Sequence, residues 1–340
     1  MGPIDKRELL ARAFGATGFT RILELLPQRR VMIVLTYHRI GDPNSTPYDS
    51  GVFSATADEL DVHLRHLKKH FHVVTPEEAV AVALGGGQNH ASVLITFDDG
   101  YLDNYELAFP VLKSNDVSAM FFLATGFVGS SRVPWWDRIA FVIKQCRENT
   151  IRMNYPEPVE FDIEQLGLFE VSRRILRIYR SPRVTEPDRF ERELAEACKA
   201  TPPGNDARPL FMSFEQAREM QAAGQVFGSH THSHTILTTL SADAQREEFR
   251  ASREILEREL KTTIDVLAYP VGTTHAFSGQ SIEGLKATGY RAAFSHYGGL
   301  NRPGEMDPYD IRRLPMDHRQ SASRFRLGTA VGGITGTRWF

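Results

Sequence analysis

The sequence predicts an α/β fold in which a mostly parallel sheet is covered by helices. Two observations carry this prediction. Short apolar runs rich in β-branched residues recur along the chain, and segments of helical periodicity lie between them. With 340 residues, 41% hydrophobic and 24% charged, the chain can form one large α/β domain or two modest ones. The pattern itself leaves open whether the sheet is open or closed into a barrel.

The predicted elements follow one another in a regular order. Seven segments have the length and composition of buried strands: 31–37, 93–97, 118–123, 225–228, 266–269, 292–295 and 311–314. Helices are predicted over 57–70, 76–84, 105–113, 214–223, 243–260 and 279–287. Thr75 and Ser213 each stand three residues before a Glu or Gln, which is the spacing of a capping box, and Gly224 suits a helix end.

Two regions interrupt this order. Residues 1–30 are predicted to hold an N-terminal helix, amphipathic over 7–26, that packs on its own domain or lies on a membrane surface. The domain itself is expected to span 31–340. From about 131 to 209 the sequence is helical, charged and interrupted by prolines, without a convincing strand, and it is predicted to be a helical insertion. The glycine-rich tail, 329–340, is expected to be irregular.

Charge and cysteine content exclude several classes of function. A formal net charge of −2 gives no basic surface for nucleic acid. Cys146 and Cys198 are the only two cysteines, so a disulfide framework or a cysteine zinc site is not expected, and any metal must use His and carboxylate. No signal-peptide core or run of transmembrane length is found, which predicts a cytoplasmic protein, with the inner membrane surface as a further possibility.

The stretch SVLITFDDGY ends a predicted strand with two adjacent carboxylates, Asp98 and Asp99, followed by Gly100. Neighbouring side chains on a regular strand point to opposite faces, so both can reach one site only if the pleat is broken, and Gly100 would allow that break. A solvated turn is the alternative interpretation, because Asp and Gly are ordinary turn residues.

The stretch GSHTHSHT follows the predicted strand 225–228 and contains three histidines. His230 and His234 are four residues apart and can direct both imidazoles to one point, whereas His232 would then point away. With one carboxylate from the Asp pair, they form a ligand set suited to Zn²⁺ and to other divalent metals. If Asp99 is the ligand, Asp98 stays free as a base for the water that the metal binds.

A third motif, Tyr-Pro-Val-Gly at 269–272, ends another predicted strand. Pro270 and the glycine fix a turn, and the backbone N–H of Val271 at its tip could stabilise an oxyanion. A plain turn is the alternative. All three motifs stand at the carboxyl ends of predicted strands, where parallel α/β barrels place their active sites.

Together, TFDDGY, HTHSH and YPVG resemble the first three motifs of the polysaccharide deacetylases of carbohydrate esterase family 4, the NodB homology domain. The resemblance spans about 31–316. It implies a distorted (β/α)7 barrel of the glycoside hydrolase/deacetylase type and metal-dependent removal of N-acetyl groups from sugars. The implied metal is most often Zn²⁺, with Co²⁺, Ni²⁺ or Mn²⁺ as alternatives. It also implies Asp98 as the base, and Asp99, His230 and His234 as metal ligands, with Thr231 shaping the turn between the histidines.

Two departures from the family pattern leave roles open. Many members have an arginine in the third motif that orients the catalytic Asp, but this chain has Ala268 there, so that role is empty or filled from elsewhere. The usual C-terminal motif with the general-acid histidine is also absent. His38 in LTYHRIGD and His318 in RRLPMDHR are the candidates for the acid, with His38 preferred, and His296 is a weaker third.

The substrate is predicted from the resemblance and the aromatic residues. Trp135 and Trp136, with Tyr101 and Tyr269, could stack on sugar rings, although paired tryptophans are more often buried anchors. The favoured substrate is an N-acetylhexosamine in a saccharide or glycolipid precursor of a cell-surface polysaccharide. A metal-dependent amidohydrolase of small amides or imides and a catalytically silent carbohydrate-binding relative are the alternatives. The oligomeric state is left open.

Overall fold

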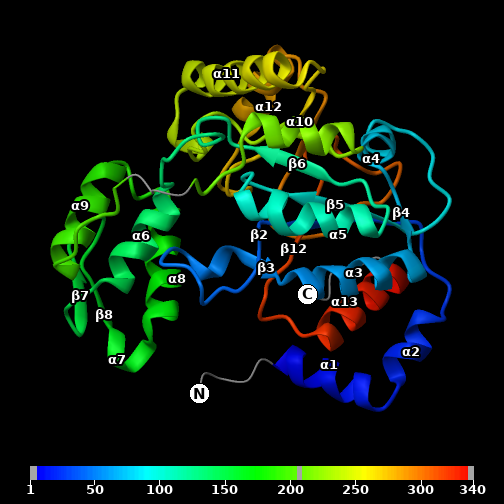
Figure 1. Cartoon of the computed structure of the whole chain (residues 1–340), viewed down its shortest axis with the longest axis horizontal. Coiled ribbons are helices and arrows are strands. Elements are labelled where there is room, and N and C mark those ends of the chain that lie inside the picture. Colours follow the sequence, from blue (N-terminus) through cyan, green and yellow to red (C-terminus); the bar gives the residue numbers. More distant parts are fainter. Residues whose placement is uncertain (1–5, 205–208, 336–340) are drawn as a thin grey trace.

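A curled sheet of parallel strands forms the centre of the molecule in the computed structural model, which describes residues 6–204 and 209–335 (Figure 1). Seven strands follow one another across the sheet: β11 (Ala292–Phe294), β10 (Val266–Ala268), β9 (Val226–Ser229), β6 (Met120–Leu123), β5 (Ser92–Phe97), β1 (Met32–Tyr37) and β12 (Leu314–Pro315). An eighth short strand, β4 (His72–Val73), pairs with the start of β5.

The last segment of the sheet joins its two ends. Leu314 in β12 pairs with Leu35 of β1, while Ile311, three residues earlier, bridges in parallel to Phe294 of β11. The chain from 311 to 315 therefore contacts both edges and curls the sheet into a distorted half barrel. The predicted α/β barrel is confirmed, and each predicted strand overlaps an observed strand or bridge.

Side chains alternate between the inside of the barrel and its helical cover. Met32 and Val34 of β1, Leu94 of β5 and Phe122 of β6 belong to one apolar cluster. Their sequence neighbours, including Ile33, belong to a second and larger cluster together with residues of the surrounding helices. Because alternate residues of a strand point to opposite faces, the smaller cluster is the filling of the barrel.

The helices between the strands cover the outside of this barrel (Figure 1). They are α3 (Ala57–His70), α4 (Pro76–Ala83), α5 (Phe109–Ser114), α10 (Phe214–Ala222), α11 (Ala242–Leu260) and α12 (Gly279–Ala287). A π-helical turn, η2 (Asn104–Ala108), leads into α5, and β2 (Arg39–Ile40), η1 (Ser50–Val52), β3 (Phe53–Ala55) and η3 (Leu237–Thr239) complete the loops. The capping boxes at Thr75 and Ser213 are formed as predicted, and Gly224 has a φ of 89°.

Both ends of the described chain are helical. The predicted N-terminal helix is two helices, α1 (Lys6–Ala16) and α2 (Phe19–Glu24), because Gly18 takes a left-handed φ of 76° between them. The expectation of an irregular tail is wrong for its described part, since α13 (Ala322–Thr335) is helical and packs against α1 and α2. Residues 336–340 of that predicted tail lie outside the described residues. No helix in the described ranges is long and apolar enough to cross a membrane.

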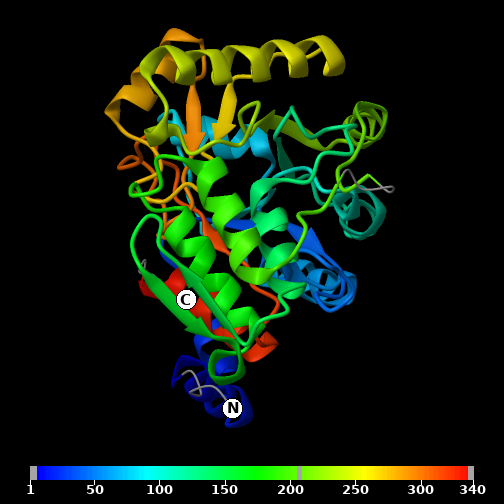
Figure 2. The same ribbon diagram turned by 90° about the vertical axis from the view of Figure 1, so that its left-hand side faces the viewer.

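The region predicted as a helical insertion contains helices and one hairpin. Its helices are α6 (Trp135–Lys144), α7 (Ile163–Leu166), α8 (Leu168–Tyr179) and α9 (Pro187–Cys198). The antiparallel strands β7 (Thr150–Met153) and β8 (Val159–Asp162) were not expected from the sequence. These elements share an apolar cluster of their own and stand beside the barrel, as Figure 2 shows from that side.

Candidate active site

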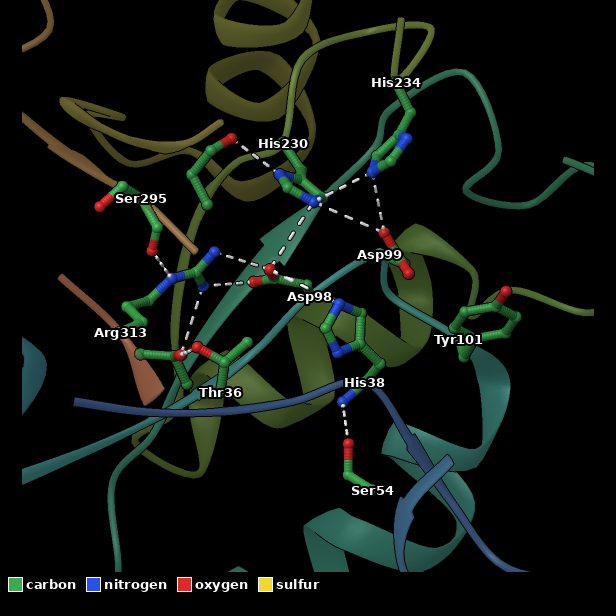
Figure 3. A network of polar contacts seen from close by, with 12 residues as sticks. Thr36, His38, Ser54, Asp98, Asp99, Tyr101, His230, His234, Ser295 and Arg313 are labelled. Carbon is green, nitrogen blue, oxygen red and sulfur yellow. Dashed lines mark hydrogen bonds and ion pairs between the residues drawn. The ribbon is translucent and has the colours of Figure 1, made fainter. Parts of the chain in front are cut away.

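The three strand-end motifs meet at one edge of the barrel. The Asp pair follows β5, the histidines follow β9, and the Tyr-Pro-Val-Gly turn follows β10. Figure 3 shows the side chains of Asp98, Asp99, His230 and His234 pointing toward one another. The carboxyl ends of parallel strands lie at the same edge, so the fold brings together residues that are more than 130 positions apart in sequence.

Asp98 continues the inward face of β5 and is clamped by an arginine. It lies two residues after Thr96 and four after Leu94, which fills the barrel, so its side chain also points inward. The two carboxylate oxygens accept hydrogen bonds of 2.6 and 2.7 Å from the two terminal nitrogens of Arg313. The side chains are 1% and 0% exposed. Such a bidentate pair fixes both the charge and the orientation of the carboxylate.

Arg313 fills the orienting role that Ala268 cannot. It lies in the segment that closes the barrel, two residues after the inward-facing Ile311. Its Nε donates to the carbonyl of Ser295 at 3.0 Å, and its guanidinium lies over the ring of Phe122 at 5.3 Å. None of the three sequence motifs contains this arginine. A signal was present, because a charged residue at an inward position of an apolar strand needs a buried partner.

The environment of Asp98 keeps it ionised. Burial alone would raise its pKa, but the charge of Arg313, with smaller contributions from His230 and His38, holds the pKa of Asp98 well below its usual range. A carboxylate that is charged and has fixed orientation is in the right state to accept a proton.

The break in the pleat occurs at Asp99 itself. Asp99 has a left-handed φ of 71°, which is uncommon for a residue with a side chain, and Gly100 follows with a φ of 81°. A Cβ atom on Gly100 would stand 2.6 Å from the side chain of Leu123, so only glycine fits there. The predicted break is present, and both carboxylates reach the same site.

Asp99, His230 and His234 form a compact group of three ligand atoms. The Nε2 atoms of the two histidines are 3.2 Å apart, and Oδ1 of Asp99 lies 3.5 Å from the first and 3.3 Å from the second. Ligands at 2.0–2.1 Å from one tetrahedral Zn²⁺ are about 3.3 Å apart. Oδ1 of Asp99 is buried and has no hydrogen-bond partner in the described chain. The donor set and its spacing fit a divalent metal.

The surroundings of His230 prepare it as a ligand. Its Nδ1 lies 2.7 Å from the carbonyl oxygen of Ala268, so Nδ1 donates its proton there and Nε2 is left with a free lone pair toward the group. Burial lowers the pKa of His230 to about 4, and the imidazole is therefore neutral near pH 7. Ala268, which stands where many family members have an arginine, thus orients His230 through its backbone carbonyl.

The turn between the histidines has the expected form. Thr231 and His234 have left-handed φ values of 65° and 57°, and the hydroxyl of Thr231 accepts a hydrogen bond from the amide of His234 at 3.2 Å. His232 points away, as expected, and its Nδ1 lies 3.0 Å from the hydroxyl of Thr125. Thr231 therefore shapes the turn that presents His234.

Two histidines lie on the other side of Asp98. Nε2 of His38 is 3.9 Å from Oδ2 of Asp98, and the ring of His296 stacks on that of His38 at 5.2 Å. Burial lowers the pKa of His296 well below its usual value, with the nearby His38 acting in the same direction. His318 is not part of this group, because its Nδ1 lies 3.0 Å from the carbonyl of Phe53. The geometry brings His38 and His296 to the site but not His318.

Known proteins share both the sequence pattern and the fold. The family model described as polysaccharide deacetylase matches residues 85–162 and 188–293. The chain belongs to the polysaccharide deacetylase family. YxkH of Bacillus subtilis strain 168, which bears the name of a polysaccharide deacetylase, is 22% identical over 295 residues, covering 86% of this chain and 74% of YxkH.

Two solved structures share the fold over most of the chain. The structure of IcaB from Ammonifex degensii has a TM-score of 0.57 at 20% identity and covers 89% of this chain and 97% of its own. The Streptococcus pyogenes deacetylase PplD in complex with acetate has a TM-score of 0.54 at 18% identity, covering 86% and 94%. The family is metal-dependent, and its members are hydrolases of carbon–nitrogen bonds.

In this deacetylase the Tyr-Pro-Val-Gly turn follows β10 and borders the cavity. Val271 has a left-handed φ of 61° and lines the cavity beside the ligand group, whereas Pro270 is buried behind it. Within 6–204 and 209–335, no residue accepts a hydrogen bond from the Val271 amide. An oxyanion role for this amide stays a prediction.

The two tyrosines predicted to stack on sugar do not reach the cavity. Tyr101 is fully buried, and its hydroxyl donates to Asp137 at 2.9 Å and accepts from the indole of Trp136 at 2.6 Å. Tyr269 donates to the carbonyl of Tyr309 at 2.9 Å, and its ring is stacked on Phe277. Both rings are occupied by protein, so the prediction of sugar stacking by Tyr101 and Tyr269 is not supported by their positions.

Trp135 and Trp136 line the cavity but expose little of their surface. They are 8% and 3% exposed, and one face of Trp135 is stacked on Tyr179 at 4.5 Å. The ring of Trp136 contacts His234 at 4.5 Å between centroids. The alternative of buried anchors describes them better than stacking platforms, because most of each ring packs on protein.

A buried network joins α6 to the Asp-Asp-Gly-Tyr loop. Asp137 is fully buried, and its two oxygens accept from the hydroxyl of Tyr101 and, at 3.0 Å, from the amide of Asp49. Burial raises the pKa of Asp137 to about 7, against the lowering effect of the Arg39 charge. Asp137 lies outside the three sequence motifs.

The cavity of the deacetylase lies between the barrel edge and the inserted helices, with a volume of about 650 Å³. Asp98, Asp99, His230 and His234 form its floor with His38 and His296. Helix α8 and the residue after its end supply three arginines to its wall. The site is therefore built by the barrel and completed by the insertion.

Proposed function

We propose that the protein is a metal-dependent deacetylase that removes the N-acetyl group of an N-acetylhexosamine in a saccharide or glycolipid precursor. The observation that supports this most is the convergence of Asp99, His230 and His234 within 3.5 Å of one another, beside an ionised Asp98 that Arg313 orients. Family membership makes deacetylation the reaction class, and the precursor is the finer proposal.

Asp99, His230 and His234 would hold the metal, with Zn²⁺ proposed from the two imidazoles and one carboxylate. Once bound, a divalent cation supplies Lewis acidity that polarises the acetamide carbonyl and acidifies a water. Asp98 would take the proton of that water as general base, because Arg313 keeps it charged and fixes its orientation.

Protonation of the leaving amine is proposed for His38. An amide nitrogen leaves as a neutral amine, so an acid is needed on the side of the substrate away from the ligands. His38 lines the cavity opposite the ligand group, and His296 packs against its ring. The amide of Val271 would donate a hydrogen bond to the oxyanion that forms at the carbonyl.

The proposed acid can be tested by matched substitutions of two histidines. His38→Gln is expected to lower kcat by about 10²–10⁴-fold, the range of a general acid. His318→Gln is the control, since that histidine bonds to a backbone carbonyl away from the cavity. A larger loss for the His318 variant would reject His38 as the acid and return the role to the other candidate.

Two alternatives to sugar deacetylation receive less support. A catalytically silent relative would be favoured by the lack of an arginine in the third motif. Arg313 orients Asp98 in its place, so this alternative loses that support. An amidohydrolase of small amides or imides would need a narrow pocket, whereas the cavity of about 650 Å³ has room for more than one sugar ring.

A position at the inner face of the membrane is also proposed. The helices α1 and α2 and the residues just after them expose six large apolar side chains: Leu9, Leu10, Phe19, Ile22, Leu25 and Leu26. Lys6 and Arg21 are exposed beside them. Apolar and basic side chains on one short amphipathic segment favour the surface of an anionic membrane.

Vesicle binding tests this position. The protein is expected to sediment with vesicles containing phosphatidylglycerol, and Ile22→Ser/Leu25→Ser is expected to stay in solution. Leu84→Ser, which changes an exposed leucine elsewhere, is the matched control. The proposed membrane position would be rejected if all three proteins sedimented equally with the vesicles. It would also be rejected if the unsubstituted protein did not sediment with them.

The decisive experiment for the function measures acetate. Zinc-loaded protein is mixed with N-acetylglucosamine oligomers or with an N-acetylated lipid-linked sugar, and Asp98→Asn is the control. We expect acetate release that the variant loses while its metal content stays unchanged. Metal-loaded protein that releases acetate from neither substrate would reject the sugar proposal and favour small amides.

A further inference from the structure

Two arginines of the inserted helix α8 and the arginine that follows its last residue line the wall of the cavity. Arg173, Arg177 and Arg180 follow one another at spacings of four and three residues, so they share one face of the helix and its end. Only the first has a carboxylate partner, because its Nε lies 2.9 Å from Glu170. In the described residues, the side chains of Arg177 and Arg180 make no ion pair or hydrogen bond.

Arg180 stands near the catalytic floor. Its guanidinium lies 5.6 Å from the ring centre of Trp135, which itself edges the cavity. Arg180 is exposed, and the charges of Asp49 and Asp99 act on it, so these groups lie close enough to interact. Arginine stays protonated at neutral pH. A full positive charge therefore faces the cavity beside the ligand group.

The carboxylates of the cavity do not account for these charges. Asp98 is neutralised by Arg313, and Asp317 accepts from Nε of Arg319 at 2.9 Å. Asp99 belongs to the proposed metal group. Asp98 and Asp317 thus have counter-charges of their own, and Arg177 and Arg180 are left without a carboxylate partner in the described part of the cavity wall. Arg177 and Arg180 are both exposed, so an anionic group in the cavity can reach their guanidinium groups.

We infer that Arg177 and Arg180 form a subsite for an anionic group of the substrate, a phosphate or a carboxylate carried by the saccharide near its acetamido group. The inference rests on the proposed deacetylase function and narrows its substrate to an anionic saccharide. Arginine is suited to this role, because its planar fork binds both kinds of oxyanion with two parallel hydrogen bonds.

The test compares three substrates that differ in charge. They are the neutral N-acetylglucosamine dimer, N-acetylglucosamine linked through diphosphate to a short prenyl chain, and a disaccharide of N-acetylglucosamine and glucuronic acid. We expect kcat/KM to be at least about 10-fold higher for one anionic substrate than for the neutral dimer. If kcat/KM rises for the diphosphate-linked sugar, phosphate is the recognised group. If it rises for the glucuronic acid disaccharide, carboxylate is the recognised group.

The variants locate the effect. Arg177→Gln/Arg180→Gln is expected to lower kcat/KM on the preferred anionic substrate by about 10- to 100-fold, mostly by raising KM. The factor by which it lowers kcat/KM on the neutral dimer is expected to be at least about 10-fold smaller. Arg180 lies near Trp135, so its replacement could disturb packing. Arg177→Gln alone avoids this and is expected to lower kcat/KM on the same anionic substrate by a smaller factor. Arg174→Gln is the matched control, since that residue pairs with Glu170 and does not line the cavity.

Two results would overturn the inference. One is a wild-type protein that hydrolyses the neutral dimer as well as both anionic substrates. The other is a double variant that loses the same factor on all three. Absence of acetate from every substrate would instead count against the deacetylase function. Calorimetric binding of the two anionic sugars to Asp98→Asn, with and without the arginine substitutions, would then decide the subsite by itself.

Discussion

Two buried aspartates of this protein have opposite surroundings. Asp98, inside the barrel, and Asp137, at the joint between barrel and insertion, are 1% and 0% exposed. Asp98 is clamped by the two terminal nitrogens of Arg313, whereas Asp137 accepts from a tyrosine hydroxyl and a backbone amide. The pKa of Asp98 is held well below its usual range, and burial raises that of Asp137 to about 7.

The difference shows that burial alone does not decide the charge of a carboxylate. Removal from water disfavours the ionised form of both residues. A bidentate guanidinium more than offsets this at Asp98, while neutral donors do not at Asp137. The barrel therefore holds a carboxylate ready to take a proton, and the joint holds one that retains its proton up to about neutral pH. The first suits catalysis, and the second suits packing.

The largest expected difference comes from making the same substitution at both positions. Asp98→Asn removes the proposed base and is expected to lower kcat by about 10²–10⁴-fold or more, with metal content unchanged. Asp137→Asn keeps the shape of a group that is half neutral near pH 7, and we expect less than about a 3-fold change. Acetate release and metal content are measured for both. A similar loss of kcat in both variants would contradict the assignment of Asp98 as catalytic and Asp137 as structural.

Removing the clamp is expected to cost stability. Arg313→Met leaves the charge of Asp98 buried without a partner, which should lower the free energy of unfolding by about 3–5 kcal/mol. The double variant Asp98→Asn/Arg313→Met removes both charges and is expected to be more stable than the single one. Denaturant unfolding of the four proteins gives the interaction energy of the pair. Additive losses would show that the two side chains are not coupled in the way their 2.6 and 2.7 Å contacts indicate.

The raised pKa of Asp137 predicts a pH dependence of stability. Between about pH 4 and 7 the folded protein keeps a proton on Asp137 that the unfolded chain has lost, so stability falls as the pH rises through this window. The full loss approaches about 4 kcal/mol above pH 7. In Asp137→Asn this contribution is absent, and we expect its Tm to fall less between pH 5 and 8. Parallel Tm profiles for wild type and variant would contradict the assignment.

The sequence predicted the parts of the site that local motifs carry. TFDDGY and HTHSH place Asp98, Asp99, His230 and His234 at strand ends, and parallel strands bring such ends together. Arg313 could not be paired with Asp98 in this way, because the two are 215 residues apart and meet only when the last segment closes the barrel. The barrel strands were predicted for a similar reason, since each is a local, continuous apolar run. The strands β7 and β8 have only four residues each and no apolar run, so they were not predicted.

Tyr101 gives the smallest effect and tests which of two roles it has. The motif suggested contact with sugar, but its hydroxyl joins Asp137 to the indole of Trp136. Tyr101→Phe leaves both partners without a hydrogen bond and is expected to lower the free energy of unfolding by about 1–3 kcal/mol. KM for the oligomer substrate should stay within about 2-fold, because the ring does not line the cavity. A rise in KM with unchanged stability would return Tyr101 to the substrate site and show that the joint depends on packing rather than on this network.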